Sequence, residues 1–239
     1  MPRTLLAAAR RFAGLLLLAL AAWAAPAQAQ GDDAMLLVAH PSLRDVDYRH
    51  TVLIAAPAPD GGHVGVILNR PTRRPLASLF PQHEPSKKVI DPVYYGGPFS
   101  RGALVALVKI EGTPGNGTVA LTRTLHMAFR ANIIDQIIET TPNEARYYVG
   151  YVGWRPGELK GEFDRGLWSV LNVDTDTVFR KDTDGLWEEL LQQTRRIRAK
   201  TGTVHDFAAA GKSWTVPDLG AEAQAAALAG ALSKFIAPR

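Results

Sequence analysis

Cysteine is absent from the 239-residue sequence, and this absence excludes several kinds of site. Disulfide bonds, lipid attachment at a cysteine and thiol nucleophiles all require it. A domain of this size can still be held together by its apolar core, so the absence of disulfides does not argue against export. Apolar residues make up 46% of the chain, which is ordinary for a globular protein with a buried core.

Acidic residues are absent from the first thirty positions, which hold three of the 27 basic residues. Removing this segment leaves 24 basic residues against 23 acidic residues. Nucleic-acid binding requires a large positive surface, and a nearly neutral chain gives it little support.

The same N-terminal segment has the three parts of a secretory signal peptide. A pair of arginines precedes the apolar run Phe12–Ala25, and Ala27 and Ala29 then supply an A-x-A cleavage pattern. The run is shorter than the ~20 residues that a membrane-spanning helix needs, so no transmembrane span is expected after cleavage. We therefore predict a signal peptide over residues 1–29 and an exported, periplasmic protein, by the Sec or the twin-arginine route. The protein would be cytoplasmic if the signal were not used.

Strand-like segments outnumber helical ones and show no regular strand–helix alternation, which favours an α+β fold over a doubly wound sheet. Strands are expected at 35–40, 51–56, 63–71, 91–95, 103–110, 145–153 and 168–173. Helices are expected at 125–139, where apolar residues recur at helical spacing, and at 185–200. Residues 72–88 are expected to form a loop with one helical turn. The domain should span 34–200, followed by an alanine-rich, helical tail over 203–239.

Motifs for catalysis or metal binding are also lacking. The sequence has no H-E-x-x-H pair and no G-x-S-x-G serine motif, so a catalytic triad could only be assembled by folding. Glu158, Glu162 and Asp164 could cluster, but carboxylates at this spacing are common on helix surfaces. We therefore predict no catalytic residue, no metal site and no cofactor.

Two further segments could bind an anion, although each has a structural explanation. The glycines of 96–102 (GGPFSRG) could expose backbone amides, but glycine and Pro98 together are better explained by a bend between two strands. Arg70, Arg73 and Arg74 could hold a phosphate or carboxylate. The alternative for these arginines is an ordinary solvated loop.

The stretch from Tyr147 to Trp168 is dense in glycine, tryptophan and charge. Strict alternation would place Tyr147, Val149 and Tyr151 on one side of a strand and Tyr148 and Val152 on the other. Trp154 is expected to cover one end of the sheet. A short helix should follow from Arg155-Pro156-Gly157, bury Leu159 and Phe163, and end at Gly166. Structural roles are then left unassigned for Glu158, Lys160 and Glu162.

Four ordered segments together resemble the YqgE/AlgH family. They are MLLVAHPSLRDVDYRHTVLIAA, GHVGVILNRP, PVYYGGPFSRGALVAL and YVGYVGWRPGEL. The resemblance implies an α+β fold in which a split, strongly curled, mixed or antiparallel sheet forms an incomplete barrel with helices packed outside. Some members carry a label as transcriptional regulators, and no general activity is attached to the family.

The chain departs from the family pattern in two places. The family reads Gly-Gln-Leu-Glu where Gly157-Glu158-Leu159-Lys160 stands here. The second departure is the signal peptide, because typical relatives look cytoplasmic. An exported protein cannot meet chromosomal DNA.

These observations predict a non-catalytic binding or accessory protein of the cell envelope. Its partner would be an unknown protein or small molecule, nucleic acid is disfavoured if the protein is exported, and the oligomeric state is open. A transcriptional regulator and a hydrolase assembled in space are the alternatives. The candidate binding residues are Asn69, Arg70, Gly96, Gly97, Trp154 and Glu158.

Overall fold

The apolar runs pair with one another and build a curled sheet of ten strands in the described part of the chain. The computed structural model describes residues 33–110 and 117–201; the predicted signal peptide and the alanine-rich tail lie outside these ranges. The strands are β1 Met35–Ala39, β2 Val52–Pro57, β3 His63–Ile67, β4 Pro71–Pro75, β5 Pro92–Tyr95, β6 Phe99–Lys109, β7 Thr118–Ala120, β8 Leu125–Ala128, β9 Ala145–Trp154 and β10 Trp168–Asn172.

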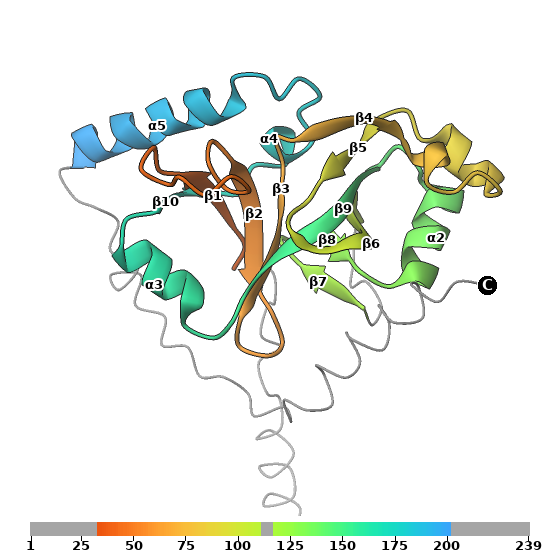
Figure 1. Cartoon of the computed structure of the whole chain (residues 1–239), viewed down its shortest axis with the longest axis horizontal. Helices are drawn as coiled ribbons and strands as arrows, with labels where there is room; N and C mark the ends of the chain where they lie inside the picture. Colours follow the sequence, from red (N-terminus) through yellow and green to blue (C-terminus); the bar gives the residue numbers. More distant parts are fainter. Residues whose placement is uncertain (1–32, 111–116, 202–239) are drawn as a thin grey trace, which may run out of the picture. The chain divides into compact units, whose positions relative to one another are not determined.

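Helices lie around the sheet (Figure 1). They are the α-helices α2 Ala131–Thr140, α3 Glu158–Asp164, α4 Thr175–Val178 and α5 Leu186–Thr201, and the 3₁₀ helices η2 Leu76–Ser78 and η3 Glu84–Lys88. Helix α5 packs beside β1 and β10, whereas α2 packs beside β6 at the other end of the sheet. No helix within the described ranges is both long enough and apolar enough to cross a membrane.

Strand β9 joins the two parts of the sheet. Its last residues pair with β3, which continues to β2, β1 and β10. Its earlier residues pair with β6, which continues to β8 and β7, and β5 joins β9 in the one parallel pairing among the described strands. This change of partner along β9 splits and curls the sheet. The α+β fold with a curled, incomplete barrel is therefore confirmed.

Gly150 breaks the alternation of β9, and the expected sidedness of this strand was wrong beyond it. Its φ is 73°, and the pairing with β6 shifts register at this point. Tyr148 and Tyr151 consequently face the same interior cluster, whereas Val152 turns to the opposite side. A bulge adds one residue to the period of two, and therefore exchanges the faces of every residue that follows.

Three apolar clusters result from this geometry. The first fills the inside of the curl and includes Tyr94, Tyr148 and residues of α5. The second lies between the sheet and α2 and includes Tyr147. The third lies under α3, where Trp154 is buried. One strand therefore contributes to all three clusters.

Two further expectations about local structure were wrong. The helix expected over 125–139 begins only at Ala131, because Leu125–Ala128 pairs with β6 and is buried on both faces. Helical spacing and burial on both faces give similar apolar runs over four residues. Strand β4 lies where a loop was expected, because its two prolines and two arginines disguise a strand that pairs only with β5.

Candidate functional site

Asn69 holds the end of the β1–β2 loop that leads into β2. Its side-chain oxygen accepts a hydrogen bond from Val52 N at 2.9 Å, and its amide nitrogen donates to His50 O at 3.0 Å. Both bonds lie at the point where the loop enters β2. Asn69 is therefore occupied in positioning this loop.

Arg70 extends the same connection. Its Nη2 donates to the carbonyl oxygens of Val46 and Arg49 at 3.1 and 3.2 Å. Its own carbonyl accepts a hydrogen bond from Tyr95 N, and its guanidinium lies 6.0 Å from the centre of the Tyr95 ring. Arg70 thus ties the β1–β2 loop to the end of β5.

Tyr95 is the centre of this polar group. Its hydroxyl donates to Asp47 Oδ1 at 2.9 Å, and a second guanidinium, that of Arg101, lies 5.8 Å from its ring centre. Arg101 Nη2 is also 3.6 Å from Asp47 Oδ1. Burial raises the pKa of the Tyr95 phenol and the hydrogen bond to Asp47 raises it further, so the phenol remains a donor. We call Asp47, Arg70, Tyr95 and Arg101 the Tyr95 junction.

Gly96 and Gly97 follow Tyr95 and bring two backbones together. Gly96 N donates to Val149 O, and Gly96 O accepts from Ile67 N. A side chain at Gly96 would overlap the carbonyl oxygen of Gly150. Because the Gly96 amide already has a partner, close packing explains the Gly-Gly pair better than a phosphate loop does.

Trp154 lies at the end of β9 and Glu158 at the start of α3, and Tyr95 packs against the same apolar cluster as Trp154. The Trp154 indole donates to Glu162 Oε2 at 2.9 Å, and the Trp168 indole donates to the same oxygen at 2.7 Å. Glu158 accepts a hydrogen bond from the backbone N of Arg155 at 2.7 Å. Four of the six candidate residues therefore lie at or next to the Tyr95 junction, whereas the polar groups of Trp154 and Glu158 are bound at the start of α3.

The carboxylates of α3 all have partners. Glu158, Lys160 and Glu162, which the sequence left without a role, therefore have structural roles. Glu162 joins two tryptophans, Glu158 closes the turn into the helix, and Asp164 pairs with Lys160 at 2.8 Å. The lysine that replaces the family glutamate therefore forms an ordinary i,i+4 ion pair on the helix surface.

Replacing Glu162 with alanine should destabilise the fold by about 2–4 kcal/mol, because two indole N–H groups would lose their acceptor. Asp164→Ala, which removes only an exposed ion pair, should cost less than about 1 kcal/mol. Urea unfolding followed by tryptophan fluorescence measures both. If both variants lost the same free energy of unfolding, the Glu162 carboxylate would contribute no more than an exposed ion pair.

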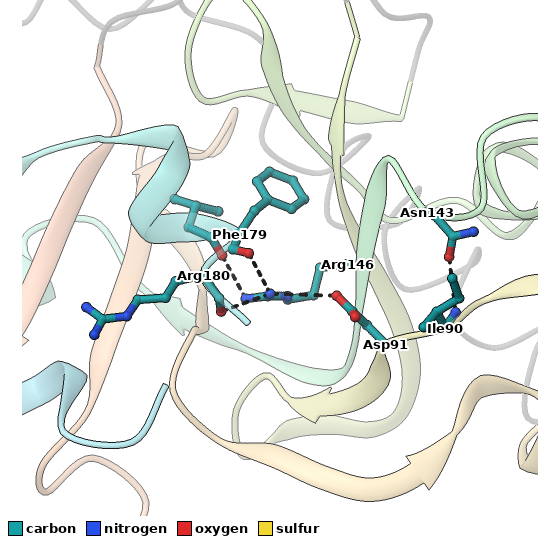
Figure 2. A network of polar contacts seen from close by, with 7 residues as sticks. Ile90, Asp91, Asn143, Arg146, Phe179 and Arg180 are labelled. Carbon is teal, nitrogen blue, oxygen red and sulfur yellow. Dashed lines mark hydrogen bonds and ion pairs between the residues drawn. The ribbon is translucent and has the colours of Figure 1, made fainter. Parts of the chain in front are cut away.

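Arg146 is a buried, charged residue that was not among the candidates from the sequence (Figure 2). Only 1% of it is exposed, although it carries a full charge. Its guanidinium donates to the carbonyl oxygens of Val178, Phe179 and Arg180 at 2.9, 3.0 and 3.0 Å, and lies 3.8 Å from Asp91 Oδ2. It therefore binds the C-terminal end of α4, where unpaired carbonyls carry partial negative charge. The available signal was an arginine inside the apolar run of β9.

The surroundings of Arg146 are aromatic. Its guanidinium lies 4.5 Å from the centre of the Tyr94 ring. Burial raises the pKa of the neighbouring Tyr148 phenol, and the charge of Arg146 opposes this shift. Figure 2 also shows Asn143 accepting a hydrogen bond from Ile90 N, which fixes the segment beside Asp91. These contacts describe a structural tie between β5, β9 and α4.

A serine and a histidine are in contact near the start of the β1–β2 loop. His40 Nδ1 lies 2.8 Å from Ser42 Oγ and also accepts a hydrogen bond from Ser42 N at 3.2 Å. The residues are two positions apart, and a backbone N–H shares the same ring nitrogen. This arrangement is typical of a local turn and does not supply the separate orienting group of a catalytic triad.

A model of the AlgH-like family matches residues 36–197 of this sequence. The chain belongs to the AlgH-like family. A UPF0301 protein from Mycobacterium leprae is 30% identical over 178 residues, which cover 72% of this chain and 86% of that protein. A UPF0301 protein from Thermobifida fusca is 32% identical over 167 residues, covering 66% and 84% respectively.

Two solved structures share the AlgH-like fold. The solution structure of AlgH from Pseudomonas aeruginosa matches with a TM-score of 0.54 at 22% identity, covering 77% of this chain and 95% of that one. A crystal structure of a protein from Corynebacterium diphtheriae matches with a TM-score of 0.55 at 21% identity, covering 69% and 87%. At these identities the likeness concerns the fold. The names of the relatives state no activity, so any function has to be argued from the residues themselves.

Proposed function

We propose that this AlgH-like chain is an exported, non-catalytic binding protein of the cell envelope, and that the Tyr95 junction holds an acidic segment of a partner protein. The observation that carries the proposal is the pair of guanidinium groups on Tyr95, at 5.8 and 6.0 Å from its ring centre. Arginine pairs with carboxylates through two parallel hydrogen bonds, and tyrosine and arginine dominate the energetics of protein interfaces.

Exposure and charge favour the same partner. The Arg101 side chain is 66% exposed, and Val46, next to Asp47, is 69% exposed and offers an apolar contact beside the charges. The three segments that meet at the junction, 40–51, 69–75 and 95–101, contain six arginines and two aspartates. Such an excess of positive charge speeds association with an acidic partner and excludes basic ones.

Two side chains of the junction are already held by hydrogen bonds before any partner arrives. Arg70 is held by two backbone carbonyls and Tyr95 by Asp47. Side chains that are already ordered lose little conformational entropy when they bind. This preorganisation is consistent with binding, and the proposal assigns no proton transfer or nucleophile to the junction.

Photocrosslinking tests the binding surface. A photoreactive amino acid in place of Val46 should form an adduct, in living cells, with an acidic segment of the partner protein. Arg101→Glu should lower the affinity for this partner by at least about thirtyfold, as expected for a central interface residue. The matched control position is Ile90, which is 78% exposed and whose backbone N–H bonds to Asn143 rather than to a residue of the junction. Adducts that form equally from both positions, or that persist in the Arg101→Glu variant, would exclude this surface.

Export is tested separately by fractionating cells and reading the N-terminus of the mature protein. The expected result is a periplasmic chain that begins near Gln30. An uncleaved cytoplasmic protein that DNA retains at moderate salt would instead favour the transcriptional regulator.

A further inference from the structure

We propose that His83, Asp135 and Glu139 form a binding site for a divalent transition-metal cation, with Zn²⁺ as the preferred ion. The three residues are far apart in the sequence and come from two elements. His83 immediately precedes η3, and Asp135 and Glu139 lie one turn apart on α2. Their potential ligand atoms all lie within 4.8 Å of one another.

The spacing of His83 and Asp135 suits two ligands of one ion, although the pair also forms a direct ion-pair contact. His83 Nε2 lies 3.1 Å from Asp135 Oδ1. This ring nitrogen is nevertheless buried without a hydrogen-bond partner, so the carboxylate oxygen lies off the axis along which the ring would donate. Two ligand atoms at about 2.1 Å from one ion, separated by roughly 90–110°, would be about 3.0–3.4 Å apart. The observed distance falls in this range.

Electrostatics also favours a cation at this position. Asp135 and Glu139 are like charges at i,i+4 on a helix, a spacing that destabilises the helix unless a positive group neutralises them. Within η3, Lys87 is engaged with Glu84, since Lys87 Nζ lies 2.6 Å from Glu84 Oε1. A bound cation would remove the repulsion and would give the buried His83 nitrogen a partner.

The ligand types determine the class of ion. One imidazole with two carboxylates suits Zn²⁺ and neighbouring first-row ions, whereas Mg²⁺ and Ca²⁺ prefer all-oxygen sites. Glu139 is exposed, so its side chain has room to rotate toward the ion. Three protein ligands leave the fourth tetrahedral position to water. Such an ion would join η3 to α2, and this site is independent of the Tyr95 junction.

Calorimetric titration of Zn²⁺ into the tag-free protein, purified from cells that express the full-length chain, tests the proposal. One saturable site per chain is expected, with no competition from an equal concentration of Mg²⁺. Glu139→Gln and His83→Ala should each weaken binding by at least about tenfold, since loss of even an outer-shell partner costs that much. Zn²⁺ should also raise the melting temperature of the wild type and not of these variants.

The matched control is Glu144→Gln, which removes the charge of another exposed glutamate near the end of α2. This variant should bind Zn²⁺ as the wild type does, and circular dichroism should confirm that all variants are folded. Absence of saturable binding would overturn the site and leave His83–Asp135 as an ion pair. Equal affinity in Glu139→Gln and Glu144→Gln would overturn it as well. Arg101→Glu should leave Zn²⁺ binding unchanged, which separates this result from the test of the Tyr95 junction.

Discussion

Arg146→Met is expected to lower the free energy of unfolding by about 3–5 kcal/mol. Removing the buried guanidinium leaves its hydrogen-bond acceptors without a donor. The carbonyls of Val178, Phe179 and Arg180 would each lose a hydrogen bond, and Asp91 would lose its cation. Methionine retains much of the volume, so the loss reports on the polar contacts rather than on a large cavity. Urea unfolding gives the free energy directly.

Arg180→Met provides the control for this experiment. Arg180 is also an arginine in an ion pair, with Nη1 2.6 Å from Glu189 Oε2, but its side chain is 37% exposed. An exposed pair of this kind contributes less than about 1 kcal/mol. A small effect in both variants would mean that water replaces the Arg146 contacts at no cost.

Gly150→Ala is expected to cost about 3 kcal/mol or more. The left-handed conformation, with φ of 73°, itself costs a non-glycine residue about 1–2 kcal/mol. The new methyl group would in addition overlap the carbonyl oxygen of Gly97, and neither backbone can move without breaking the pairing of β9.

Gly157→Ala separates these two contributions. Gly157 has a similar φ of 82°, but no atom lies within 4 Å of the position that a side chain would take. Its substitution should therefore cost only the conformational part, about 1–2 kcal/mol. If thermal and urea unfolding give the same loss for Gly150→Ala and Gly157→Ala, the close approach of Gly150 to Gly97 is unimportant.

Local patterns were sufficient for much of the fold. The segment after Trp154 was expected to form a short helix that buries Leu159 and Phe163 and ends at Gly166. In the structure α3 spans Glu158–Asp164, Leu159 is buried, and Gly166 has a left-handed φ of 68°. These features depend on residues that are close in the sequence, so proline, glycine and apolar spacing are adequate signals.

Long-range pairing was the source of the errors. Leu125–Ala128 continues the apolar stripe of a helix, yet it becomes a strand because β6 offers it a partner. The two sides of β9 exchange at Gly150, where Gly97 approaches its backbone from the connection between β5 and β6. A neighbour distant in the sequence decides both outcomes, and intrinsic propensity is too weak to resist it.

The candidate site likewise combines residues that local sequence indicates with residues that only long-range contacts bring in. Asn69, Arg70, Gly96 and Gly97 were selected as polar or glycine-rich positions, and they do meet at one place. Tyr95, Asp47 and Arg101, which complete the junction, carry no local signature of their own. The same is true of His83, whose neighbours on α2 follow it only after four intervening strands.

The sequence by itself determined the family, the α+β class and the corner at Trp154, because these depend on residue types at short and fixed spacings. Only the tertiary structure decided which side chains meet: Arg146 with the end of α4, Arg70 and Arg101 with Tyr95, and His83 with Asp135. The physical reason is that such contacts depend on strand register and on how strongly the sheet curls. A single bulge at Gly150 changes both without changing the apolar pattern around it.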